Sequence, residues 1–105
     1  MNCGMIGKRS RKMTHIVFFE LKDPTPENRE ALVKILQKLN TEDVPMAQSF
    51  ECGADILGSD RSLDAALVVK LPADQLEAYA NDPYHCRIKA EMAPLLQRSM
   101  TVDFD

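Results

Sequence analysis

The chain has 105 residues, 45% of them hydrophobic and 28% charged, which is the balance of a single globular domain and excludes a disordered or fibrous protein. No run of about 18 apolar residues occurs, so the sequence predicts neither a membrane-spanning segment nor a membrane partner. The net charge is −3, and residues 13–105 hold 9 of the 13 basic side chains but all 16 acidic ones, an acidic body that argues against a nucleic-acid partner.

The first twelve residues read as an addition to the domain. They hold four basic side chains and no acid, and they lack the apolar stretch of a secretory signal. A second methionine, Met13, stands just before the first predicted strand. We therefore expect residues 1–12 to be a dispensable basic leader, either a misassigned start or an unordered arm, and residues 13–105 to form the domain. The alternative is an arm that contacts nucleic acid or the acidic body of a partner.

The first half of the domain predicts a strand, a helix and a second strand. Residues 15–22 are rich in β-branched and aromatic side chains, which are typical of a strand. Thr25 is a candidate N-cap and Pro26 suits the first helical position, so a helix should run from there to about Leu39. Its apolar positions follow helical spacing: Leu32, Ile35, Leu36 and Leu39. A second strand is predicted for residues 46–54.

The second half begins with a turn at Gly58-Ser59-Asp60. The apolar segment 63–71 predicts a third strand, which Pro72 should end. A short helix is then predicted for residues 74–80.

A second helical piece and a last strand complete the chain. Asp82 is a candidate N-cap and Pro83 the first residue of a new helix, which Pro94 should kink or end. The apolar residues of this helix are Ile88, Met92, Leu95 and Leu96. Residues 99–104 alternate between polar and apolar side chains and predict the last strand.

The element order β-α-β-β-α-β predicts an α+β fold of the ferredoxin-like type, a four-stranded antiparallel sheet with both helices on one face. The first and third predicted strands are substantially apolar on both faces: Val17, Phe19 and Leu21 alternate with Ile16 and Phe18 on the first strand. Two helices can cover only one face, and large apolar patches are uncommon on soluble monomers. We therefore expect a homodimer in which an identical sheet covers the other face.

The three cysteines, Cys3, Cys52 and Cys86, form no close pair. An odd number of separated thiols fits free cysteines in a reducing compartment, so we expect a cytoplasmic protein. Adjacent residues point apart on a helix, so His85 and Cys86 do not make a metal site. No phosphate-binding loop, nucleophile motif or metal-ligand spacing is found, and we expect no cofactor and no metal.

Several segments spread over residues 13–105 resemble the stress-responsive dimeric α/β-barrel family. They are His15-Ile-Val-Phe-Phe-Glu-Leu-Lys-Asp23, Asp64-Ala-Ala-Leu-Val-Val69, Leu76-Glu-Ala-Tyr79, Asp82-Pro83-Tyr84-His85 and Val102-Asp103-Phe104. The resemblance implies a dimeric α/β barrel, with the two sheets forming a central barrel, the helices outside and a cavity between each sheet and its helices.

Most members of this family have no established activity, and several plant members are induced by stress. One plant branch, olivetolic acid cyclase, closes a linear polyketide without a cofactor. The resemblance to that branch singles out His15, Tyr79 and His85 as matching its two histidines and its tyrosine. A further histidine of the branch corresponds to Ala65 here, which is a departure from its pattern. Related dimeric barrels include cofactor-independent monooxygenases.

His15, Tyr79 and His85 are therefore the candidate site residues, and we expect them to meet in the layer between sheet and helices. His15 shares a strand face with Val17 and Phe19, and His85 lies in the first turn of its helix. A neutral His85 accepts a proton, but the helix N-terminus and Asp82 act on its charge in opposite directions, and the sequence leaves the balance open.

Two functions follow. The first is a stress-responsive protein that binds a small apolar or aromatic ligand, with the three residues orienting it or serving structure alone. The second is a cofactor-free enzyme of the cyclase or monooxygenase kind, in which Tyr79 donates a hydrogen bond to a carbonyl or enolate oxygen.

Overall fold

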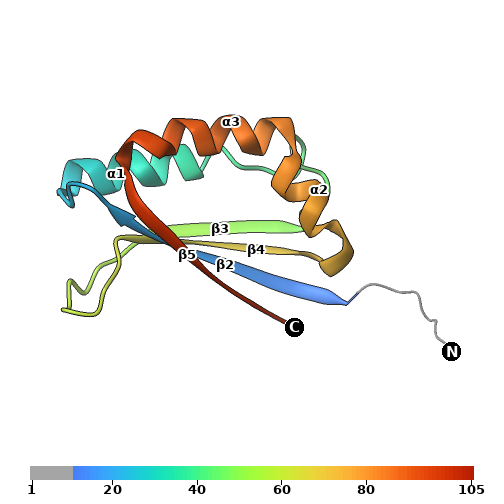
Figure 1. Cartoon of the computed structure of the whole chain (residues 1–105), viewed down its shortest axis with the longest axis horizontal. Helices are drawn as coiled ribbons and strands as arrows, with labels where there is room; N and C mark the ends of the chain where they lie inside the picture. Colours follow the sequence, from blue (N-terminus) through green and yellow to red (C-terminus); the bar gives the residue numbers. More distant parts are fainter. Residues whose placement is uncertain (1–10) are drawn as a thin grey trace, which may run out of the picture.

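The computed structural model describes residues 11–105 (Figure 1). The elements in chain order are β2 (Lys12–Leu21), α1 (Pro26–Leu36), β3 (Ser49–Ala54), β4 (Ala65–Pro72), the 3-10 turn η1 (Ala73–Gln75), α2 (Leu76–Asn81), α3 (Pro83–Met92), the 3-10 turn η2 (Ala93–Leu95) and β5 (Leu96–Phe104). Apart from Arg11 and Lys12, the predicted leader lies outside the described residues, and its dispensability stays a prediction. Within residues 11–105, no helix is long and apolar enough to cross a bilayer.

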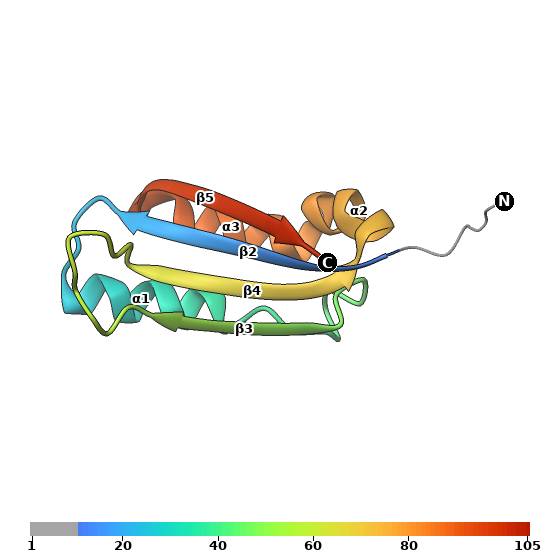
Figure 2. The ribbon, with the colours of Figure 1, turned by 90° about the horizontal axis from the view of Figure 1, so that it is seen from below.

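The four strands form one antiparallel sheet in the order β3-β4-β2-β5. Helices α1 and α3 lie on one face of this sheet (Figure 1), and the opposite face is left open, as the view from below shows (Figure 2). Connecting β2 to β3 through α1, with β4 lying between them, is the split β-α-β arrangement of the ferredoxin-like fold. The predicted fold class is therefore confirmed.

The starts of α1 and α3 lie where the sequence predicts them, whereas α2 begins at Leu76 rather than residue 74, after the 3-10 turn η1. The hydroxyl of Thr25 accepts a hydrogen bond from the backbone N–H of Asn28 at 3.1 Å, and α1 begins at Pro26. The carboxylate of Asp82 accepts a bond from the backbone N–H of His85 at 2.9 Å, and α3 begins at Pro83. Each cap satisfies an N–H that has no partner inside its helix.

Several boundaries differ from the prediction because tertiary contacts decide them. β2 begins at Lys12 rather than residue 15, because Lys12 pairs with Pro72 and the carbonyl of Arg11 accepts a bond from the N–H of Ala73 at 2.7 Å. β5 begins at Leu96, a residue that the sequence predicts on the preceding helix. The helical conformation ends with the turn η2 at Leu95, and Leu96 pairs with Leu21 of β2.

The first helix and the second strand are shorter than predicted. α1 ends at Leu36 rather than Leu39, because the N–H groups of Lys38 and Leu39 bond to carbonyls three positions back and tighten the chain into turns. Leu39 is still buried. β3 begins at Ser49 rather than residue 46, because the N–H of Ala47 bonds to the carbonyl of Val44 in a turn.

The core lies between the sheet and the helices. β2 and β4 contribute odd-numbered positions, with Phe19 and Leu21 buried on β2, and Leu67, Val69 and Leu71 on β4. The helices contribute Leu32, Leu36, Tyr79, Ile88 and Met92. This confirms that the face of β2 carrying His15, Val17 and Phe19 points toward the helices.

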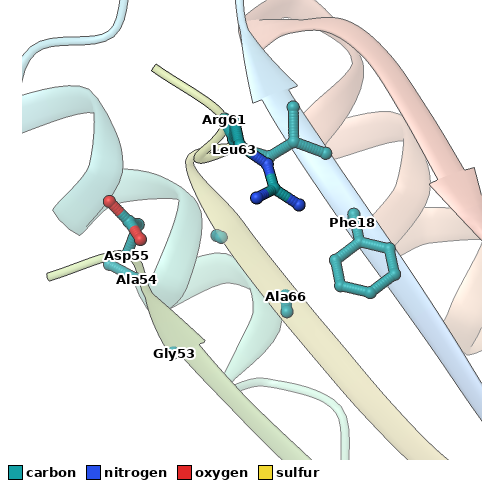
Figure 3. A pocket seen from close by; sticks show the side chains of 8 residues that line it. Phe18, Gly53, Ala54, Asp55, Arg61, Leu63 and Ala66 are labelled. Atoms are coloured by element: carbon teal, nitrogen blue, oxygen red, sulfur yellow. The ribbon is translucent and has the colours of Figure 1, made fainter. Parts of the chain in front are cut away.

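The opposite face of the sheet, which we term the outer face, is formed by Ile16, Phe18, Ala66, Val68, Met100, Val102 and Phe104. The strand register places them together, because Ile16 pairs with Val68 and with Val102, and Phe18 with Ala66 and Met100. Val102 and Phe104 are each 51% exposed. A hollow of about 480 Å³ lies beside Phe18 and Ala66, bordered by Leu63 and Arg61 (Figure 3).

Candidate functional site

The three predicted site residues line one cavity of about 310 Å³. It lies between the β2–β5 half of the sheet and the helices α2 and α3. Its lining residues are His15, Val17, Phe19, Leu67, Leu76, Tyr79, Ala80, His85, Lys89, Met92, Ala93, Leu96 and Ser99. Most of the wall is apolar, with a few polar groups converging on it, which is the composition of small-molecule sites. The predicted convergence is therefore observed, while the role of the three residues stays a prediction.

His15 is held by a carboxylate on the neighbouring strand. It projects from the helix-facing side of β2, and its Nδ1 is hydrogen-bonded to Oδ1 of Asp103, its cross-strand partner on β5. The carboxylate accepts this bond, so Nδ1 carries the proton and the ring is fixed in orientation. Sequence reasoning missed Asp103 as a site residue. The alternation of residues 99–104 places Asp103 on one face of the last strand. Pairing it with His15 required the register of β5 against β2, which the alternation does not give.

Tyr79 stands between the two histidines. Its ring stacks on the imidazole of His85, with centroids 4.0 Å apart and planes 17° from parallel. His15 approaches the same ring edge-on, with centroids 5.9 Å apart. Tyr79 is only 2% exposed, and among the described residues its hydroxyl has no hydrogen-bond partner. Burial, and secondarily the charge of Asp82, raises the pKa of this phenol, which stays protonated and able to donate.

His85 is fixed by the residue on which it stacks. Its Nδ1 lies 2.8 Å from the backbone carbonyl of Tyr79. A carbonyl only accepts hydrogen bonds, so Nδ1 carries the proton and Nε2 is the basic nitrogen of the neutral ring. Nδ1 also joins the C-terminal part of α2 to the first turn of α3.

Burial decides the charge of His85, which the sequence left open. Desolvation lowers its pKa below the ordinary value of 6.5, and the electrostatic effects of Lys89 and His15 act in the same direction. The bond to the Tyr79 carbonyl and the Asp82 carboxylate oppose this shift without reversing it. His85 is therefore neutral at pH 7 and able to accept a proton.

Two further polar side chains, Lys89 and Ser99, border the cavity. The Nζ of Lys89 donates a hydrogen bond to the backbone carbonyl of Ala80 at 3.3 Å. Ala65, the residue that corresponds to a further histidine in the cyclase branch, is buried and is absent from the lining of this cavity. Within the part of the chain that the structure describes, no three His, Cys, Asp or Glu side chains are placed to hold a metal ion.

Comparison with known proteins assigns the chain to a family. Residues 13–105 match the stress responsive A/B barrel domain. A dimeric ferredoxin-like protein of unknown function from Thermobifida fusca is 27% identical, with a TM-score of 0.76 and 94% of each chain covered. A dimeric protein of unknown function from Bacteroides fragilis is 19% identical, with a TM-score of 0.78, 93% of this chain and 99% of the other.

The hydroxynitrile lyase of Passiflora edulis has the same fold at 13% identity, with a TM-score of 0.71 and coverage of 90% of this chain and 93% of that one. A search of curated proteins gives no match. The match to the family extends over the whole described domain except its first two residues. The chain is thus a member of the stress responsive A/B barrel domain family.

Proposed function

We propose that the protein is a cytoplasmic homodimer that binds a small apolar or aromatic ligand in the cavity lined by His15, Tyr79 and His85. The apolar outer face supports the dimer, and two solved relatives are described as dimeric. The described cysteines, Cys52 and Cys86, are free thiols, which suits a reducing compartment.

The hydroxyl of Tyr79 is the observation that carries the ligand-binding proposal. A buried polar group without a partner costs about 1–3 kcal/mol, so such groups in native proteins call for an explanation. This hydroxyl belongs to a side chain that lines the cavity, and a bound acceptor would satisfy it. We infer that the ligand presents a carbonyl or similar oxygen to Tyr79 while its apolar body contacts Val17, Leu67 and Met92.

The test compares two probes of nearly the same shape, acetophenone and α-methylstyrene, which differ by having an oxygen or a methylene at one position. Binding is followed by the imidazole NMR signals, which are simple to assign because the chain has two histidines. Acetophenone should bind the unmodified protein roughly fivefold more tightly than α-methylstyrene, the value of one hydrogen bond. The Tyr79→Phe variant should bind the two equally. Failure of both probes to shift either histidine would overturn the proposal.

The second candidate function is a cofactor-free enzyme that removes a proton next to a carbonyl. A neutral His85 with a basic Nε2, stacked on a phenol that can donate to an enolate oxygen, favours it. The likeness to a hydroxynitrile lyase concerns the fold alone, so the geometry of the three residues carries this candidate.

Acetophenone in D₂O tests the enzyme. His85 would take a methyl proton, the enolate oxygen would be hydrogen-bonded by Tyr79, and a deuteron would return to carbon. The methyl signal should then fade faster than in buffer, and His85→Ala and Tyr79→Phe should abolish the excess rate. If acetophenone binds but its methyl protons exchange no faster than in buffer, the enzyme function is rejected and the ligand-binding function stays.

A further inference from the structure

We propose that Lys89 makes the cavity selective for apolar organic acids, with the ligand's negative charge held at Lys89 and its apolar body inside. This inference rests on the ligand-binding function proposed above and adds the charge of the ligand. It assigns to Lys89 a role in specificity rather than in fold stability.

The position of Lys89 follows from helical spacing. His85 and Lys89 are four residues apart, so α3 presents them on the same face, one turn after the other. Both side chains line the cavity, and His85 is buried while Lys89 is exposed. The charge of Lys89 contributes to lowering the pKa of His85, which agrees with this proximity. A ligand whose apolar part is enclosed beside His85 would therefore have its outer end at the ammonium group.

The charges around the cavity favour an anion over a cation. The residues that line it include no aspartate or glutamate, and Lys89 is the one side chain among them that carries a fixed charge. The nearby carboxylate of Asp103 is bonded to His15, and that of Asp82 caps α3. A cationic ligand would meet Lys89 without a compensating acid.

The ammonium group of Lys89 is available for a ligand. Its hydrogen bond is to a neutral carbonyl, that of Ala80, and no ion pair of Lys89 occurs among residues 11–105. Lys34 on α1, by contrast, is paired with Glu30 at 3.5 Å. An ammonium ion donates up to three hydrogen bonds, so Lys89 can keep the bond to Ala80 and still bind a carboxylate.

The net negative charge of residues 13–105 limits which anions can bind at Lys89. Residues 13–105 have more acids than bases, so the overall field of the molecule repels anions. An isolated anion such as acetate gains little at an exposed lysine. Only an anion with an apolar body adds the burial of that body to the contact with Lys89. The ligand class is thus an amphipathic monoanion, such as an aromatic or medium-chain carboxylic acid.

Two fluorescent probes test the proposal. 8-Anilino-1-naphthalenesulfonate and N-phenyl-1-naphthylamine share their aromatic body, and the first carries one negative charge that the second lacks. Lys89→Met should weaken binding of the sulfonate roughly five- to tenfold and change binding of the neutral amine less than twofold. Lys89→Arg should retain the sulfonate affinity. Raising the salt concentration should weaken only the sulfonate.

Two control variants make the outcome specific. Lys34→Met removes an equal charge from an exposed position outside the cavity lining and should leave both affinities unchanged. Ser99→Trp adds an indole at an exposed lining position of β5 and should block both probes.

The two proposals fail in different ways. Equal weakening of both probes by Lys89→Met, or no weakening of either, would overturn the charge selectivity and leave ligand binding in place. No binding to the unmodified protein, or binding that Ser99→Trp does not affect, would overturn ligand binding in the cavity and the selectivity with it.

Discussion

At the scale of single residues, the cavity depends on a histidine that is kept neutral. The pKa of His85 is lowered mainly by burial, so between its folded-state pKa and 6.5 the unfolded chain binds more protons than the folded one. Folding stability should therefore fall as the pH drops below 6.5 and become independent of this group above it. The limiting slope for one histidine is about 1.4 kcal/mol per pH unit.

Denaturant unfolding at about pH 7.5 and pH 5.5 measures this slope. His85→Gln keeps a side-chain donor for the Tyr79 carbonyl but does not titrate, so its unfolding free energy should change less over the same interval. An identical pH dependence in the variant and in the unmodified protein would show that other groups govern it.

At the scale of elements, the junction between α2 and α3 positions two of the three site residues. Asp82→Ala removes the cap of α3, and Thr25→Ala removes the equivalent cap of α1. Each should cost about 1 kcal/mol of unfolding free energy, because one helical N–H loses its acceptor.

The two cap variants separate stability from positioning. Only Asp82→Ala should also shift the imidazole signals of His85 and weaken acetophenone binding, since Asp82 contacts the first turn in which His85 lies. Equal effects of both variants on the histidine signals would mean that the junction has no special role in shaping the cavity.

At the scale of the whole molecule, the outer face should be the surface between two copies. Val68 lies near its middle, paired with Ile16 across the strands. Val68→Asp would bury a charge without a partner in that contact and should convert the dimer to a monomer. Ala78→Asp, at an exposed position of α2, is the matched control and should remain dimeric. Sedimentation at micromolar concentration decides between them, and a monomeric unmodified protein would contradict the dimer.

The parts of the fold that local chemistry determines could be predicted from the sequence. In Thr25-Pro26 and Asp82-Pro83, an N-cap residue next to a proline marks the start of a helix. The alternation along β2 is enough to place His15 on the helix face. The pairing of His15 with Asp103 joins residues 88 positions apart. It depends on the register between β2 and β5, which cannot be predicted from either segment alone. The pKa shift of His85 depends on burial, and the start of β5 at Leu96 depends on its pairing with Leu21.

The alternation of β2 has a consequence for how the length of this strand can vary. Adjacent residues serve different surfaces, since His15 and Val17 line the cavity while Ile16 and Phe18 belong to the outer face. Deleting one residue would exchange the two sets, sending the imidazole to the subunit boundary and a phenyl ring into the ligand space. Insertions and deletions here should therefore come in pairs. A single extra residue is tolerable only where the register between β2 and β5 already shifts, which is between Glu20 and Leu21.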